Sequence, residues 1–171
     1  MFAQDESRVG LLTVRRRRLT ARGVQPVGLI QHTFQRFSVY GAVAPTTGEH
    51  FFLQRSGLNS AHFQVFLDAL AQAYPDTLNV LVLDNSGAHT AKRVIIPANI
   101  RLVLLPPYTP ELNPMERVWR ALKDELAWMH FADLDTQQAH VTTILRTYDA
   151  ATLQSLTAYT YFVEAVNALS A

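Results

Sequence analysis

Hydrophobic and polar residues follow two different periods along this chain, and these periods predict where strands and helices lie. Residues 78–84 form a nearly continuous apolar run that ends in a carboxylate, the pattern of a strand buried on both faces of a sheet. Residues 2–14 are also predicted as a strand. Residues 29–44 alternate in part between apolar and polar side chains, as a half-buried strand does. A turn over residues 45–49 is expected to return the chain through residues 51–54 as an antiparallel strand.

Helical spacing begins after these early strands. A cap followed by apolar residues at i, i+3, i+4 and i+7 predicts the first helix, with Asn59 or Ser60 as the cap and then Phe63, Phe66, Leu67 and Leu70. A short helix is expected near residues 90–95, stopped by Pro97. A second apolar strand is expected over residues 100–105.

The order of these elements predicts the fold class. A strand-helix-strand succession after residue 78 predicts a parallel pair joined by a right-handed crossover. A further helix is expected from Glu116 to about Met129, and more helices over residues 133–169. We therefore expect one α/β domain over residues 1–171. Its sheet is expected to be mixed and five-stranded, with three early, largely antiparallel strands followed by the parallel pair, and helices on its faces.

Composition narrows the class of protein. With 171 residues and 49% hydrophobic content, the chain can build one domain with a proper core. No apolar run reaches the roughly 18 residues of a membrane span. The N-terminal residues show no basic region of a signal peptide. The absence of cysteine excludes disulfides and thiolate metal sites, and it fits a cytoplasmic protein without a membrane partner.

The net charge of +1 conceals an uneven distribution. Residues 1–36 carry seven basic and two acidic side chains, and residues 92–123 carry six basic and two acidic ones. Residues 124–171 carry one basic and six acidic side chains. Two basic segments of this kind suit a polyanionic partner, although solvated surface is their ordinary explanation.

Two carboxylates stand where open α/β sheets bind ligands. Asp84 ends a buried strand, and Glu116 lies in the first turn of a predicted helix. Ligands bind at the carboxyl ends of the strands, so these two side chains could begin a metal site. Asp84 also has a structural explanation as a turn residue in Asp-Asn-Ser-Gly. Glu116 has two structural explanations: it could form a capping box with Asn113, or a salt bridge with Arg120.

The segment around Glu116 has a highly specific counterpart in a known family. Residues 107–119 are Pro-Tyr-Thr-Pro-Glu-Leu-Asn-Pro-Met-Glu-Arg-Val-Trp. This segment closely resembles the third-carboxylate motif of DDE transposases, in the branch shared by mariner-like elements and bacterial insertion sequences. Residues 84–89 resemble the second-aspartate motif of that family, and 31 residues separate Asp84 from Glu116. Residues 2–7 resemble its first-aspartate strand, which makes Asp5 the first candidate.

The resemblance implies a fold, a chemistry and a cofactor. It implies an RNase H-like fold in which Asp5, Asp84 and Glu116 hold two divalent ions, Mg²⁺ or Mn²⁺. Carboxylate oxygens are the ligands that these hard cations prefer. The implied activity is metal-dependent phosphodiester cleavage and strand transfer on the ends of a DNA transposon. Basic residues and one histidine near these motifs are candidates for DNA contacts: Arg15, Arg16, Arg17, Arg18, His89, Lys92, Arg93, Arg120 and Lys123.

The resemblance also implies partners. The expected partner is double-stranded DNA, both the transposon ends and the target. The protein is expected in the bacterial cytoplasm, and on the nucleoid when it is bound to DNA. Full-length relatives carry N-terminal helix-turn-helix modules, which this chain lacks, so a DNA-binding domain or polypeptide outside the chain is expected, and a homodimer is a further option. Two alternatives stay open: another RNase H-like nuclease, and an inactive or partner-dependent remnant that only binds DNA or dimerises.

Overall fold

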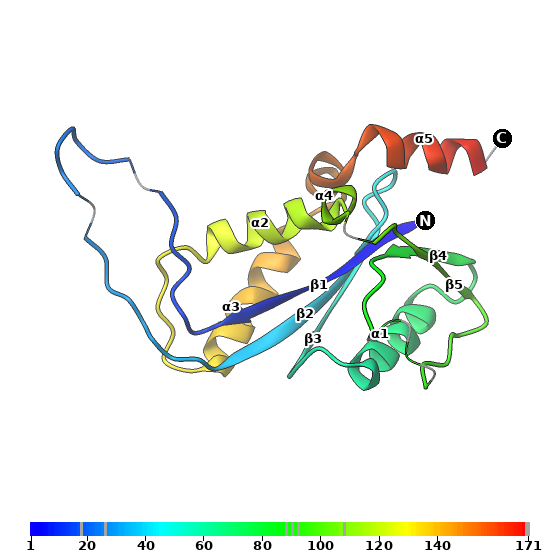
Figure 1. Ribbon diagram of the computed structural model, residues 1–171, viewed down its shortest axis with the longest axis horizontal. Coiled ribbons are helices and arrows are strands. Elements are labelled where there is room, and N and C mark those ends of the chain that lie inside the picture. The colour runs from blue at the N-terminus through cyan, green and yellow to red at the C-terminus, as the bar shows by residue number, and fades with distance from the viewer. Residues whose placement is uncertain are drawn as a thin grey trace.

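A five-stranded mixed sheet organises the molecule, as the sequence predicts (Figure 1). Figure 1 shows a computed structural model that describes residues 1–17, 19–25, 27–87, 89, 91, 93–107 and 109–169. The strands lie side by side in the order β3-β2-β1-β4-β5. Their bounds are β1 Phe2–Gly10, β2 Arg36–Val43, β3 His50–Arg55, β4 Asn79–Leu83 and β5 Ile100–Leu104.

The pairing of the strands confirms the predicted directions. β1 pairs with β2, and β2 with β3, in antiparallel fashion. β4 runs parallel to both β1 and β5. β1 and β4 share only the pairs Phe2 with Leu81 and Ala3 with Val82. Beyond Ala3, therefore, the side of β1 that faces away from β2 has no partner strand in the described part of the sheet.

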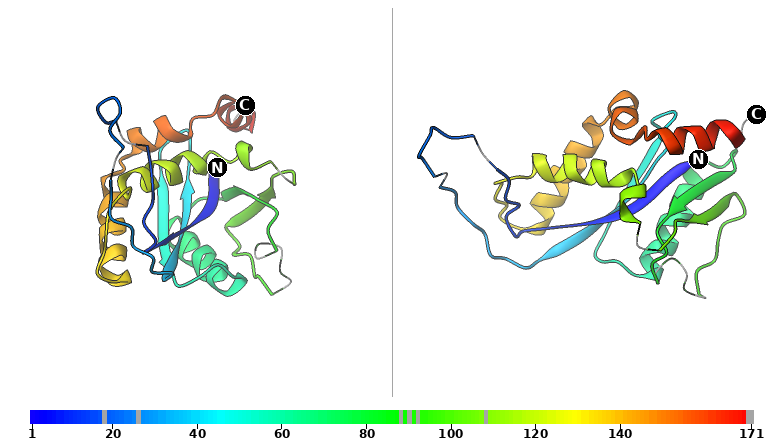
Figure 2. Two further views of the ribbon diagram at one scale, coloured as in Figure 1. Left: turned by 60° about the vertical axis from the view of Figure 1, so that its left-hand side comes forward. Right: turned by 45° about the horizontal axis from the view of Figure 1, so that its top comes forward.

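Helices cover the two faces of the sheet (Figures 1 and 2). Helix α1 (Ser60–Ala73) packs on one face and buries its apolar side chains against β1, β2, β4 and β5. The other face carries α2 (Met115–Glu125), α3 (Leu134–Thr147), α4 (Ala150–Thr157) and α5 (Thr160–Leu169). Strand alternation divides β1 between the layers, because successive side chains point to opposite faces. Phe2 belongs to the α1 core, whereas Ala3 and Val9 belong to the α2 core.

Local signals set the start of α1 as predicted. The side chain of Asn59 accepts a hydrogen bond from the backbone nitrogen of His62 over 2.9 Å, so Asn59 is the N-cap. Phe63, Phe66 and Leu70 are fully buried against the sheet. Burying such large side chains stabilises the fold by about 1.5–3 kcal/mol each.

The crossover between β4 and β5 differs from the expected helix. In the described part of residues 90–96, the chain is irregular and holds one turn bond, from Val94 N to Ala91 O over 2.9 Å. Thr90 and Lys92 lie outside the described residues. The run Val94-Ile95-Ile96 is β-branched and Pro97 follows it, so helix formation is unfavourable here. The predicted helix was wrong for the residues that the structure describes.

A second difference lies between β1 and β2. β1 ends at Gly10 and β2 begins at Arg36, so both strands are shorter than expected. The described residues between them form an extended arm that projects beyond the sheet (Figures 1 and 2). The arm returns onto the turn after α2, where Trp128 Nε1 donates to Arg16 O over 3.1 Å.

No helix among the described residues is long and apolar enough to cross a bilayer.

Candidate active site

The three predicted carboxylates come together at one pocket. Asp5, Asp84 and Glu116 all line a cavity of about 460 Å³ at the end of the sheet where β4 and β5 finish. The parallel pairing of β1 with β4 ends at Ala3 and Val82, and Asp5 and Asp84 each lie two residues beyond that pair. Glu116 reaches the same cavity from the first turn of α2. The rest of the wall comes from the loops after β4 and β5: Asn85, Ser86, Leu105, Pro106, Pro107, Thr109 and Asn113.

The carboxyl group of Asp5 has a strongly shifted pKa. Burial raises its pKa to about 7, and the negative charges of Glu6 and Asp84 act in the same direction. Two hydrogen bonds oppose this rise, one from the backbone and one from Trp119, whose Nε1 donates to Oδ2 of Asp5 over 3.0 Å. A carboxyl group that ionises near neutral pH inside a pocket is characteristic of functional sites.

Asn113 ties the start of α2 to β1 and so positions Glu116. Its Nδ2 donates to the carbonyl oxygen of Gln4 over 2.8 Å, and its Oδ1 accepts from the backbone nitrogen of Met115 over 3.1 Å. Asn113 is buried, at 5% exposure. In sequence, Asn113 is a candidate only for a helix cap. Its contact with β1 joins residues 109 positions apart, which no local pattern reveals.

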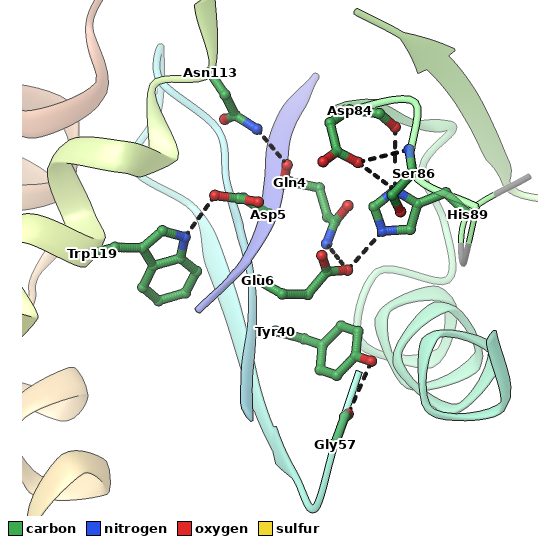
Figure 3. Close-up of polar contacts among 10 residues, drawn as sticks. All are labelled: Gln4, Asp5, Glu6, Tyr40, Gly57, Asp84, Ser86, His89, Asn113 and Trp119. Carbon is green, nitrogen blue, oxygen red and sulfur yellow. Dashed lines mark hydrogen bonds and ion pairs between the residues drawn. The ribbon is translucent and has the colours of Figure 1, made fainter. Parts of the chain in front are cut away.

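Asp84 stands at the rim of the pocket with 55% of its side chain exposed. Its Oδ1 accepts a hydrogen bond from the backbone nitrogen of Ser86 over 3.1 Å, which is the turn chemistry that the sequence suggests. The same oxygen lies 2.8 Å from Nδ1 of His89. Figure 3 shows the second carboxylate oxygen pointing away from His89.

His89 lies on the opposite side of β1 from Asp5 (Figure 3). It is buried, and its Nε2 lies 2.7 Å from Oε1 of Glu6. Burial lowers the pKa of the imidazole, but the hydrogen bonds and charges of Glu6 and Asp84 outweigh this effect and raise the pKa above its ordinary value. His89 was predicted as a DNA contact, and in the structure its ring faces two carboxylates of the protein itself.

A groove adjoins the pocket along the unpaired side of β1. It measures about 490 Å³ and shares Asp5 and Glu116 with the pocket. Four cationic side chains line it, which are Arg8, Arg16, Arg120 and Lys123. Three of these were predicted as DNA contacts. Arg8 was missed, because a single arginine within a strand has no sequence signal until the open side of that strand is known.

Among the remaining predicted DNA contacts that the structure describes, two lie on the arm and one contacts the start of α1. Arg15 and Arg17 are exposed on the arm. Arg16 forms an ion pair with Asp124 of α2 as well as lining the groove. Arg93 lies outside the groove and donates to Oγ of Ser60 at the start of α1. Arg18 and Lys92 lie outside the described residues.

The pocket suits a hard divalent cation by the chemistry of its side chains. Its three carboxylates supply oxygen ligands, which Mg²⁺ and Mn²⁺ prefer, and a buried carboxylate such as Asp5 is stabilised in its ionised form by a cation. Among the described residues, no three His, Asp or Glu side chains stand close enough together to hold an ion as they are placed. Three like charges repel one another, which is a physical reason for their separation.

Comparison with known proteins settles the family. The family model described as DDE superfamily endonuclease matches residues 1–138. The chain belongs to this family. Over 106 residues it is 34% identical to the uncharacterised protein y4pE/y4sA of Sinorhizobium fredii (strain NBRC 101917 / NGR234), covering 60% of this chain and 77% of that protein.

The fold of this DDE family member is similar to that of the Mos1 transposase. A Mos1 transposase paired-end complex with the left transposon end and a Mos1 mariner paired-end complex with Mn each match with a TM-score of 0.69 at 16% identity. Each match covers 91% of this chain and 50% of the Mos1 chain, so the chain spans about half the length of that transposase. The mixed sheet flanked by helices is therefore RNase H-like, as the sequence resemblance implies.

Proposed function

We propose that this chain is a transposase catalytic domain that carries out metal-dependent phosphodiester cleavage and strand transfer on the ends of a DNA transposon. The strongest support for this proposal is the position of the three carboxylates. Asp5, Asp84 and Glu116, which the family resemblance selects from three distant segments, line a single pocket. Membership of the DDE superfamily endonucleases supports the same chemistry.

In this proposal the three carboxylates hold two Mg²⁺ or Mn²⁺ ions. Such ions, when bound, activate a water or a 3′-hydroxyl and stabilise the leaving oxygen of a phosphodiester. The protein contributes orientation. Trp119 fixes the Asp5 carboxylate, and Asn113 fixes the turn that presents Glu116. None of these side chains needs to form a covalent bond to DNA.

The groove beside the pocket supplies phosphate contacts in this proposal. Arg8, Arg120 and Lys123 line it next to Asp5 and Glu116, so a DNA backbone held there passes the carboxylates. Binding through such contacts is salt-sensitive and independent of sequence. Recognition of the transposon ends on the nucleoid then falls to a DNA-binding domain or polypeptide outside this chain, and a homodimer could bring two ends together.

The test is DNA nicking by the purified chain with Mn²⁺, Mg²⁺ or Ca²⁺. Wild type is compared with Asp84→Ala and with the control variant Asp68→Ala. The Asp68 carboxylate lies on the outer side of α1 and accepts a hydrogen bond from Gln64. We expect wild type and Asp68→Ala to nick DNA with Mn²⁺ or Mg²⁺, and Asp84→Ala to lose at least about 100-fold in rate. The magnitude follows from the loss of a group that stabilises the transition state.

Other outcomes favour the two alternatives. Cleavage of RNA in hybrids, or of branched DNA, in preference to transposon-like duplex ends would indicate another RNase H-like nuclease. DNA binding without nicking under any divalent ion, even after addition of an N-terminal DNA-binding module from a relative, would indicate an inactive remnant. Equal nicking by wild type and Asp84→Ala would exclude the proposed catalytic site.

A further inference from the structure

Adjacent residues of β1 deliver carboxylates to opposite faces of the sheet. Asp5 points toward α2, where Trp119 donates to it, whereas Glu6 points toward the layer of α1 (Figure 3). This follows from strand alternation, which separates neighbouring side chains. The Glu6 side chain is only 11% exposed. It does not line the pocket of Asp5 and Asp84, but it contributes to the wall of the adjoining groove. A carboxylate that is largely buried so close to a candidate site needs a physical reason.

The partners of Glu6 connect it to that site. Its Oε1 accepts a hydrogen bond from Nε2 of Gln4 over 3.0 Å and lies 2.7 Å from Nε2 of His89. The other ring nitrogen of His89 lies 2.8 Å from Oδ1 of Asp84 and 3.2 Å from the backbone oxygen of the same residue. One imidazole thus spans from a largely buried carboxylate to the residue that supplies a carboxylate at the pocket rim.

The imidazole itself has little freedom to move. Its side chain is 1% exposed, and its ring centroid lies 4.4 Å from that of Phe63, which is fully buried in α1. Phe63 fixes the position of the ring, and Glu6 fixes its rotation because it holds Nε2. The position of Nδ1, and with it the direction of the Asp84 carboxylate, follows from these two contacts.

We propose that Glu6 is a positioning residue of this site, and that it acts through His89 to hold the Asp84 carboxylate in the orientation that binds a divalent cation. The proposal rests on the proposed function, since it concerns the same pocket. His89 and the backbone nitrogen of Ser86 both engage Oδ1 of Asp84, so the second oxygen is the one presented to the pocket. Without His89, a side chain that is 55% exposed has several rotamers available.

The experiment measures the dissociation constant of Mn²⁺ from the shift in thermal unfolding temperature, together with DNA nicking. The variants are Glu6→Ala, Glu6→Gln, His89→Ala and the double variant Glu6→Ala/His89→Ala, with Asp68→Ala as the control carboxylate. Partners that orient metal ligands typically change metal affinity about 10- to 100-fold when removed. We expect Glu6→Ala and His89→Ala to weaken Mn²⁺ binding by that amount.

Two further comparisons separate positioning from simple support of the fold. Glu6→Gln keeps an oxygen that can accept from His89, so it is expected to retain most of the affinity. The double variant is expected to bind Mn²⁺ no more weakly than His89→Ala, because Glu6 acts only through that ring. The proposal is overturned if the fold-losses of Mn²⁺ affinity in the two single variants multiply in the double variant. It is also overturned if Glu6→Gln binds Mn²⁺ as weakly as Glu6→Ala.

The outcomes also distinguish this proposal from the proposed function. A Glu6→Ala protein that unfolds at a lower temperature without metal, yet binds Mn²⁺ and nicks DNA like wild type, overturns positioning and leaves the proposed function standing. A wild type that neither binds Mn²⁺ nor nicks DNA overturns both. Wild-type nicking, with the predicted order of Mn²⁺ affinities among the variants, supports both.

Discussion

Trp119 Nε1 donates a hydrogen bond to Oδ2 of Asp5, so α2 supports one carboxylate of the pocket while supplying another, Glu116, from its first turn. Directly across the β1–β2 ladder from Asp5 is Gly41. A Cβ on Gly41 would lie 2.7 Å from Cη2 of Trp119, so the missing side chain makes the space in which the indole reaches Asp5.

Trp119→Phe is expected to destabilise the protein more at about pH 8 than at about pH 5. The phenyl ring keeps contact with Phe52, with which Trp119 forms an edge-to-face pair, but it cannot donate to Asp5. A lost hydrogen bond to an ionised group costs about 1.5–3 kcal/mol, and Asp5 is ionised above its pKa of about 7. Urea unfolding at the two pH values measures the difference.

The matched control is Trp128→Phe. Trp128 donates to the backbone carbonyl of Arg16, an acceptor that does not titrate, so the cost of this variant is expected to be independent of pH. Equal costs for Trp119→Phe at the two pH values would contradict the role assigned to the indole.

Asp5→Asn is expected to stabilise the metal-free protein at neutral and alkaline pH. Because burial raises the pKa of Asp5 from 3.8 to about 7, the folded state holds this proton more tightly than the unfolded state. The wild-type free energy of unfolding therefore falls as pH rises between these two values, and the variant lacks that fall. The difference between the proteins is expected to grow to about 4 kcal/mol by pH 8, at about 1.4 kcal/mol for each pKa unit.

Divalent cations are expected to reverse this order. In excess Mg²⁺ at about pH 8, an ionised Asp5 gains a bound cation, so wild type is stabilised and Asp5→Asn is not. Thermal unfolding with and without Mg²⁺ measures both effects. If the difference in unfolding free energy between wild type and Asp5→Asn does not change between pH 4 and pH 8, then Asp5 has an ordinary pKa.

Gly41→Ala is expected to destabilise the fold and to slow nicking. The added Cβ would lie 2.7 Å from Cε of Met115 and 2.9 Å from Cε1 of Phe52, as well as against Trp119. Overpacking of this kind costs about 1–3 kcal/mol, and it displaces the indole from Asp5. Gly57→Ala is the control, because its Cβ meets only His62 at 3.9 Å. Equal stability of the two variants would contradict the close packing at Gly41.

The double variant Arg120→Ala/Lys123→Ala is expected to weaken DNA binding and reduce its salt dependence. Both side chains line the groove beside Asp5 and Glu116. The slope of log affinity against log salt is negative, and each lost phosphate contact reduces its magnitude by about 1. The double variant is therefore expected to reduce the magnitude by about 2. Fluorescence anisotropy over a salt series measures it. Arg146→Ala, in a separate hollow beside β3, is expected to leave the slope unchanged.

The sequence alone determined the features that depend on short stretches of chain. A buried run that ends in Asp84 predicts a strand with a carboxylate at its end, and Asn59 ahead of a helical pattern predicts a cap. The antiparallel early strands and the parallel later pair follow from turns and crossovers in the same way. The specific motif around Glu116 then selected three carboxylates from distant segments, and these line one pocket.

Only the tertiary structure decided which side chains support those carboxylates. Trp119 and Asp5 are 114 positions apart, and Glu6 and His89 are 83 apart, so no local period links either pair. Alternation along β1 requires Asp5 and Glu6 to face opposite ways, but packing of α1 and α2 decides what each one meets. His89 is only a candidate DNA contact in sequence. Its burial could not be predicted there, because Phe63 and Glu6 reach it only when the sheet and α1 have assembled.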